Sequence, residues 1–157
     1  MKILVMKFGG TSVADLERIR QISGFKKAHF AGHSLGGMIC PAYSRKFPNR
    51  VISLGLLSTA AGRTKKDILK ITNIIKAMEE NGIPETLKVL TNRWFTNEFI
   101  KKHYDVVKQR LEEVIKTDAK IFLNVFRIYA KTEMAHWLST VTAPSLVLTG
   151  EHDEGCN

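Results

Sequence analysis

The sequence is poor in cysteine and has no long apolar run. Its 157 residues include two cysteines, Cys40 and Cys156, too few for the disulfide framework of a small secreted domain. No stretch approaches the roughly 18 apolar residues of a membrane-spanning helix. The apolar run at residues 3–6 is too short for a signal peptide, and no cleavage pattern follows it. We therefore expect a soluble, cytoplasmic protein that does not associate with membranes.

Acidic residues are the minority among the charged ones. Lys and Arg number 24 against 15 Asp and Glu, which gives a formal net charge of +9. Such a balance attracts anions in general. The basic residues are spread along expected helix faces and form no tight block, so a solvated surface and a functional basic patch both stay open. Nucleic acid is not expected as a partner.

The first third of the chain alternates between strand and helix patterns. Apolar runs near residues 3–6, 29–31 and 51–57 are typical of buried strands. Amphipathic stripes predict helices over about 13–22 and 36–47, the second of which Pro48 ends. This alternation predicts a parallel sheet with right-handed crossovers.

Helical periodicity dominates from about residue 65 to residue 140, and a last strand follows at 145–149. We expect an α/β fold: a small parallel sheet with flanking helices and a helical cap inserted before the last strand. Such an insertion covers the carboxyl ends of the strands, where ligands bind; a plain helical extension is the alternative. The residues expected on the helical faces are Ile68, Ile71, Ile74, Ile75 and Met78; Phe99, Val106, Val107, Arg110, Leu111, Val114 and Ile115; and, on a broader apolar face, Ile121, Phe122, Val125, Phe126, Ile128 and Tyr129.

A G-x-S-x-G motif centred on Ser34 joins the strand at 29–31 to the helix that follows it. In this motif the serine occupies a strained turn, and the residues two positions to either side are small because strand and helix approach closely there. The N–H of Leu35 would lie at the helix N-terminus, where it stabilises a developing oxyanion. The alternative is a structural turn with an inert serine. The elbow consists of Gly32, His33, Ser34, Leu35, Gly36 and Gly37.

Residues 29–61, with this motif and the Phe47–Val51 segment after it, resemble the elbow, helix and next strand of the α/β-hydrolase family. Within the family the lactonase and esterase branch is most similar. Residues 143–153 resemble the family's late strand and acid loop. The resemblance covers about residues 25–157. It implies that Asp153 is the triad acid; a capping loop carboxylate is the alternative.

The family's histidine follows one strand and one helix after the acid, whereas this sequence stops four residues after Asp153. The family's first strands are also replaced by residues 1–23. We therefore expect a truncated hydrolase domain without its general base, which acyl transfer requires. None of the histidines present is expected to substitute; they are His29, His33, His103, His136 and His152.

Residues 5–13 resemble a different family, the aspartokinases, at their N-terminal phosphate-binding segment. The glycines would let backbone N–H groups approach phosphate oxygens, and the basic and hydroxyl side chains would add charge and donors. The residues concerned are Lys7, Gly9, Gly10, Thr11 and Ser12. A chain joining parts of two families is an apparent chimera; a fusion, a rearranged gene, a gene-model artefact and an engineered recombinant all stay open.

We interpret the chain as one truncated domain: residues 1–24 kinase-like, 25–63 elbow core, 64–142 helical cap, and 143–157 last strand and acid loop. The expected function is hydrolysis of small esters or lactones by Ser34, without metal or organic cofactor and incomplete without the base. A self-associating fragment that pairs through its sheet edges and a phosphate- or nucleotide-binding fragment are the alternatives. The aromatic residues Trp94, Phe95, Phe126 and Trp137 would line an apolar pocket or pack in the cap core.

Overall fold

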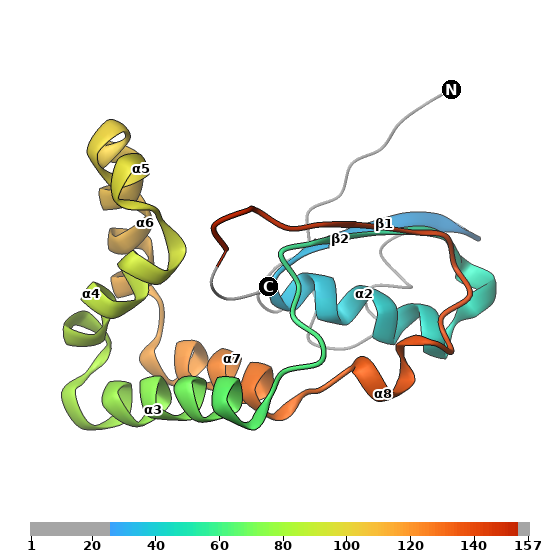
Figure 1. The fold of residues 1–157 in the computed structure, drawn as a ribbon, viewed down its shortest axis with the longest axis horizontal. Helices are drawn as coiled ribbons and strands as arrows, with labels where there is room; N and C mark the ends of the chain where they lie inside the picture. Colours follow the sequence, from blue (N-terminus) through green and yellow to red (C-terminus); the bar gives the residue numbers. More distant parts are fainter. Residues whose placement is uncertain (1–25, 154–157) are drawn as a thin grey trace.

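The computed structural model describes residues 26–153 and places a three-stranded parallel sheet at one end of the molecule (Figure 1). The strands are β1 (Ala28–His33), β2 (Val51–Leu57) and β3 (Ser145–Leu148), in the spatial order β1-β2-β3. In the register, Gly32 lies opposite Leu56, and Leu56 lies opposite Val147. The carboxyl ends of all three strands therefore share one edge of the sheet.

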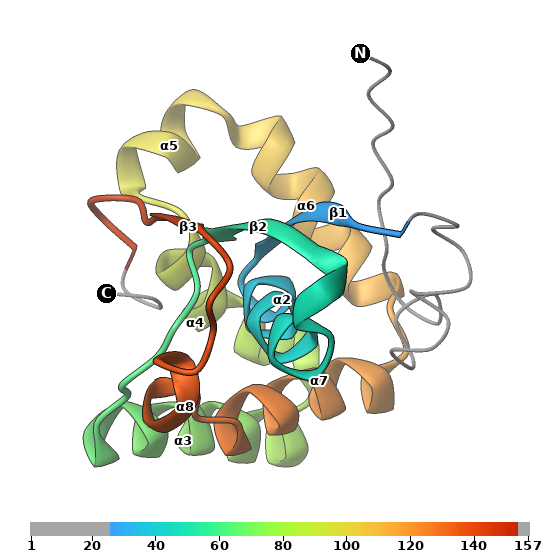
Figure 2. The ribbon, with the colours of Figure 1, turned by 90° about the vertical axis from the view of Figure 1, so that its right-hand side faces the viewer.

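One helix covers one face of this sheet (Figure 2). Helix α2 (Leu35–Lys46) follows β1 directly, and the 3-10 turn η2 (Pro48–Arg50) leads into β2. Side chains that alternate along the strands point toward α2, and their removal from water is the main contribution to stability here. The buried cluster consists of Cys40, Tyr43, Val51, Leu54 and Leu56.

Between β2 and β3 the chain forms six helices (Figure 1). Thr64, Asp118 and Thr96 are the N-caps of α3, α7 and α5, and each side chain accepts a backbone N–H of the first turn. Gly82, with φ 82°, separates α3 from α4. The helices are α3 (Lys65–Asn81), α4 (Ile83–Trp94), α5 (Asn97–Lys102), α6 (Tyr104–Lys116), α7 (Ala119–Lys131) and α8 (Ala135–Leu138). We call this segment the cap.

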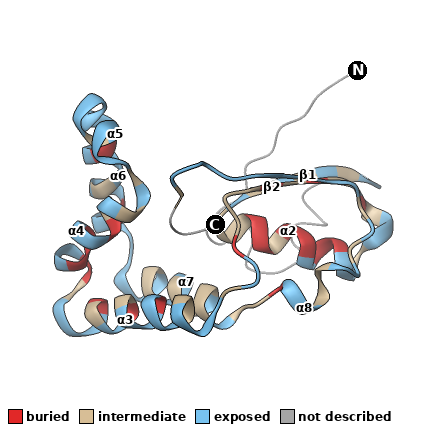
Figure 3. Cartoon of the chain, viewed as in Figure 1, coloured by how far each residue is buried: buried red, intermediate tan, exposed pale blue. Residues whose placement is uncertain are grey.

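The cap has a hydrophobic cluster of its own, built from α3, α4 and α6 (Figure 3). The stripe expected on α3 is confirmed, because its members are buried or half-buried. The residues expected on the faces of α5, α6 and α7 do lie on helices, but only part of them is buried or half-buried. Among the described residues these helices pack on neighbours along one side, so part of the apolar residues expected on their faces is exposed. The exposed members are Phe99, Val106, Arg110, Ile115, Ile121, Val125 and Ile128.

The fold class expected from the sequence is confirmed: a small parallel sheet carries a helical cap inserted before its last strand. The first expected strand and helix, and the anion-binding residues Lys7, Gly9, Gly10, Thr11 and Ser12, lie outside the described residues and stay predictions. Within the described part, no helix is both long and apolar enough to cross a bilayer.

Candidate active site

Ser34 lies in the sharp turn between β1 and α2, at the carboxyl edge of the sheet. Its φ of 53° and ψ of −120° are an unfavourable backbone conformation for an L-residue, and such strain clusters at functional sites. The backbone holds the turn from both sides: the N–H of Ser34 donates to Leu57 O at 2.9 Å, and Met38 N donates to Ser34 O at 3.2 Å. The Ser34 side chain does not cap α2. Its hydroxyl is therefore not engaged by the helix that it precedes.

The glycines around Ser34 differ in how much space they have. A Cβ on Gly32 would lie 2.2 Å from Gly36 C and 2.6 Å from Gly37 N, so only glycine fits there. The expectation that Gly36 is equally crowded is wrong, because a Cβ on it would meet nothing within 4 Å. The second crowded position is Gly37, where a Cβ would lie 1.6 Å from Thr59 Oγ1. The close approach thus involves the backbone of Gly36 and not its side-chain position.

Thr59 is a residue of this site that the sequence reasoning missed. Its Oγ1 lies within hydrogen-bond distance of two carbonyl oxygens, to which its hydroxyl can donate: Ser34 O at 3.3 Å and Leu57 O at 3.2 Å. It thereby links the loop after β2 to the turn at Ser34. Its neighbour Ser58 also has a positive φ, of 45°, and donates its N–H to Leu148 O. A hydroxyl two residues beyond a strand end, at the edge that carries the motif, was the available signal.

Leu35 is the first residue of α2, so its N–H belongs to the group of N-terminal amides without partners inside the helix. These amides, with the helix dipole behind them, favour negative charge next to Ser34. The first turn contains no acidic side chain to compete for them. The position is suited to an oxyanion that forms on a group attached to Ser34 Oγ.

Asp153 lies in the loop after β3, half-buried, and its N–H closes a turn by donating to Gly150 O at 3.0 Å. Because β2 separates β1 from β3, and neighbouring strands are roughly 4.8 Å apart, the ends of the two outer strands are about 10 Å apart. Ser34 and the loop that contains Asp153 therefore follow strands whose carboxyl ends share one edge of the sheet. Their catalytic roles stay predictions.

No histidine hydrogen-bonds to Ser34 within residues 26–153. His29 Nδ1 and Ser53 Oγ are 2.7 Å apart on strands β1 and β2, and His103 packs its ring against Phe99 at 4.7 Å. His33 belongs to the elbow, His136 lies on α8, and His152 precedes Asp153; all three are exposed. The absence of a general base at Ser34 thus remains the expectation.

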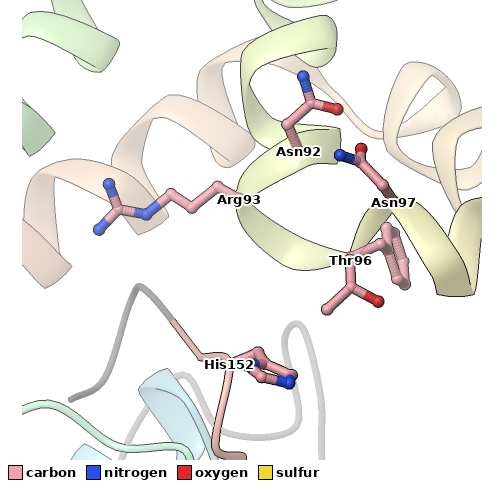
Figure 4. Close-up of a pocket in the computed structure, with 6 residues that line it drawn as sticks. Asn92, Arg93, Thr96, Asn97 and His152 are labelled. Carbon is pink, nitrogen blue, oxygen red and sulfur yellow. The ribbon is translucent and has the colours of Figure 1, made fainter.

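A pocket of about 370 Å³ opens between the cap and the loop after β3 (Figure 4). The α4–α5 corner provides four polar residues and Phe95, and His152 faces them from the loop after β3. Hydrogen-bonding groups dominate the wall, and Arg93 brings a positive charge without an acidic neighbour among the lining residues. The polar residues of the corner are Asn92, Arg93, Thr96 and Asn97.

Four aromatic residues were expected either to pack in the cap core or to line an apolar pocket, and most of them do not line this cavity. Of them only Phe95 lines it. Phe126 packs against the cap cluster, while Trp94 and Trp137 lie beneath the guanidinium groups of Arg110 and Arg45. Two of the rings are therefore covered by cations, which is a common arrangement for half-exposed aromatic residues.

The described residues do not offer a reactive thiol or a cluster of metal ligands. Burial raises the pKa of the Cys40 thiol to about 11, so it is not a nucleophile at neutral pH. No three His, Cys, Asp or Glu side chains in the described part of the chain gather as metal ligands would. Cys156 lies outside that part.

Known proteins resemble this chain in sequence and in fold. The family described as alpha/beta hydrolase fold matches residues 10–75. The chain is 25% identical over 139 residues to 3-oxoadipate enol-lactonase 1 of Acinetobacter baylyi, covering 88% of this chain and 52% of that protein. It is 27% identical over 137 residues to 2-hydroxy-6-oxononadienedioate/2-hydroxy-6-oxononatrienedioate hydrolase of Burkholderia vietnamiensis, covering 83% and 47%.

Among solved structures, the enol-lactonase from Burkholderia xenovorans LB400 superposes with a TM-score of 0.77 at 18% identity, over 87% of this chain and 52% of that one. The chain spans about half the length of the curated relatives that it matches. Together with the turn at Ser34, these similarities show that the chain has the α/β-hydrolase fold in the part that they share.

Proposed function

We propose that the chain carries the nucleophile half of a serine hydrolase of the α/β-hydrolase type. The observation that supports this most strongly is the strained backbone of Ser34 between a strand and a helix N-terminus. Ser34 Oγ would attack a carbonyl carbon, and the Leu35 N–H would stabilise the negative charge that develops on the carbonyl oxygen. Asp153, at the same edge, would orient a base.

Residues 26–153 place no general base at Ser34. Because no histidine contacts Ser34 among the described residues, we propose that Ser34 reacts with activated electrophiles but turns over ordinary esters slowly. The helix N-terminus alone still favours the tetrahedral intermediate, and a triad that lacks one member retains roughly 10³-fold catalysis over water. Stoichiometric labelling is therefore a better assay than turnover.

The test is labelling with a fluorophosphonate probe, followed by peptide mapping. We expect the probe on Ser34 in the parent chain and none in Ser34→Ala. The matched control is Ser58→Ala, which removes another serine at the same edge with a positive φ but no helix behind it. Equal labelling of the parent and Ser34→Ala would remove the claim of an activated serine.

The substrate class is proposed from the pocket beside the site. Arg93 takes part in none of the ion pairs found among the described residues, and the pocket wall contains no carboxylate. Both curated relatives are named for derivatives of dicarboxylic acids. We propose that the substrates are small esters or lactones carrying a free carboxylate, which Arg93 would bind as a charge-assisted pair.

Protection from labelling tests this choice. Monomethyl adipate should slow labelling of Ser34 more than methyl hexanoate does, and Arg93→Gln should remove the difference. A charged hydrogen bond contributes about 1.5–3 kcal/mol, which corresponds to a preference of roughly tenfold or more. Equal protection by the two esters in the parent chain would refute the carboxylate part of the proposal.

A second candidate function is self-association, which the exposure of β3 favours. All four residues of β3 are exposed, with Leu146 at 58% and Val147 at 63%, and an uncovered apolar edge strand invites pairing with another strand. We propose a second copy as the partner. Light scattering should show a dimer that Val147→Lys converts to a monomer, while Leu69→Lys on α3 leaves it intact. A monomeric parent chain would end this candidate.

A further inference from the structure

Two chain segments connect helices α3 to α7 of the cap to the sheet: residues 58–64, which leave β2, and residues 132–144, which include α8 and return to β3. Each segment carries one charged residue whose side chain is largely shielded from water. The Arg63 side chain is 6% exposed and that of Glu133 is 29% exposed, and Arg63 Nε lies 3.6 Å from Glu133 Oε2. The two residues are 70 positions apart, so their meeting is a feature of the fold.

Glu133 binds both connecting segments with one carboxylate. Its Oε1 accepts Gly62 N at 2.8 Å from the outgoing segment, and Met134 N at 2.7 Å and Ala135 N at 2.8 Å from the returning one. Its Oε2 accepts Arg63 N at 3.1 Å. Desolvation would raise the pKa of this carboxyl, but the four backbone donors outweigh it and lower the pKa to about 2.

Arg63 binds the end of α7 in return. Its Nη1 donates to Tyr129 O at 2.6 Å, its Nη2 donates to Thr132 O, and its guanidinium lies over the Tyr129 ring, 4.6 Å from the centroid. The last carbonyl groups of a helix have no partners inside the helix, and a cation is favoured there. Arg63, a residue of the outgoing segment, thus holds the helix from which the returning segment departs.

Other contacts between the cap and the sheet are slight. Helices α3 to α7 pack on one another, while the strands pack on one another and on α2. The two hydrophobic clusters share no residue. Helix α8 contacts α2, where the Arg45 guanidinium lies 5.2 Å from the centroid of the Trp137 ring. Besides this contact, among the described residues, little other than the Arg63–Glu133 pair and the connecting chain fixes how α3 to α7 stand over the Ser34 edge.

We propose that Arg63 and Glu133 form a clasp that sets the position of the cap over the carboxyl edge of the sheet, and that both are positioning residues for the group that binds there. Gly62, with φ 72° and open space at its Cβ position, is the hinge that moves when the clasp is released. The cap itself remains folded, because its own cluster does not include the clasp.

The distance between cap and core tests the clasp directly. Spin labels are placed at two exposed sites, Asn49 in the core and Lys88 in the cap, after substitution to cysteine in a Cys156→Ser chain. Cys40 is buried and stays unlabelled. We expect a narrow distance distribution in the parent chain and a broadened, shifted one in Glu133→Ala and Arg63→Ala.

The matched control is the Arg127–Glu79 pair, which joins α7 to α3 inside the cap, with both side chains 42% exposed. Glu79→Ala should leave the distribution unchanged. Circular dichroism establishes that each variant is folded. If Glu133→Ala does not fold, Arg63→Lys decides, because it keeps the charge but loses the two-pronged contact. An unchanged distribution in the folded clasp variants, or equal broadening in Glu79→Ala, would overturn the clasp.

A second readout rests on the proposed function. Displacing the cap should lower the rate of Ser34 labelling by on the order of 10²-fold, since a small misplacement has that effect on a reacting group. Arg63→Lys should recover part of the rate. A clasp that only stabilises the fold would lower the melting temperature and leave the rate unchanged. If the parent chain does not label at all, the proposed function fails while the distance measurement still tests the clasp.

Discussion

The sheet region and the cap are specified by different physical constraints. Around Ser34 the backbone itself is crowded: a methyl group at Gly32 would overlap the backbone of Gly36. In the cap the constraint is burial, with Leu90 fully enclosed among α3, α4 and α6. The structure around Ser34 therefore depends on contacts between individual backbone atoms, whereas the structure of the cap depends on the burial of the apolar faces of its helices. Apolar side chains are exposed at several positions of the cap, whereas Gly32 and Gly37 in the elbow have no space for a side chain at all.

Two glycines of the elbow provide the sharpest test of this comparison. Gly32→Ala should destabilise the chain by about 3 kcal/mol or more, because overpacking against backbone atoms has no side chain that can move aside. Gly36→Ala adds the same methyl group in open space and should stabilise by about 0.5–1 kcal/mol, as alanine does inside a helix. Urea denaturation measures both. Similar effects from the two variants would show that the elbow is not crowded as described.

Creating a cavity in each region tests whether the cap and the sheet region unfold separately. Leu90→Ala in the cap and Leu54→Ala in the sheet should each cost about 2–5 kcal/mol, because both side chains are almost completely buried. With little packing between the regions, we expect Leu90→Ala to accelerate hydrogen exchange in α3, α4 and α6 but not in β1 and β2. Uniform acceleration would mean that cap and sheet form one cooperative unit.

The sequence was sufficient to predict those elements of the sheet region that depend on residues close to one another in the chain. The motif at Ser34 and the stop at Pro48 predict β1, α2 and β2 nearly to the residue, since they act through neighbours in the chain. It was insufficient where distant segments meet. Thr59 fills the space beside Gly37; its place two residues after a strand end marks it as a candidate, but the sequence does not show that it contacts this helix. Helical periodicity identified the apolar side of α7, but it does not say whether another element covers that side.

The clasp between the two regions should make the chain sensitive to acid. Glu133 has a pKa of about 2 in the folded chain and an ordinary value near 4.5 when unfolded. Its contribution is therefore complete above about pH 4.5 and is lost as the pH falls toward 2. The shift corresponds to at most about 3 kcal/mol. The free energy of unfolding between pH 7 and pH 2.5 should fall less steeply in Glu133→Gln, and parallel curves would contradict this.

Strain at Ser34 predicts a variant that is more stable but inactive. Ser34→Gly relieves a backbone conformation that costs an L-residue on the order of 1–3 kcal/mol, though glycine also gains freedom in the unfolded chain. We expect a net gain of about 1–2 kcal/mol together with complete loss of probe labelling. Ser34→Ala keeps the strain and should lose only the labelling. A destabilised Ser34→Gly would show that the turn stores no strain.

The smallest expected change in stability concerns the N-cap of α3, where a side-chain hydrogen bond stabilises the first turn of the helix. Thr64 Oγ1 accepts Asp67 N at 3.3 Å, and Asp67 Oδ2 accepts Thr64 N at 3.0 Å. The Thr64 side-chain bond is the main cause that lowers the pKa of Asp67. Thr64→Ala should cost about 1 kcal/mol. Thr72, in the same helix, bonds only the Ile68 carbonyl, so Thr72→Ala should stabilise slightly through helix propensity. Thermal melts of Thr64→Ala and Thr72→Ala compare a threonine that caps α3 with one inside the helix. Equal shifts in melting temperature would show that N-capping contributes nothing to the stability of α3.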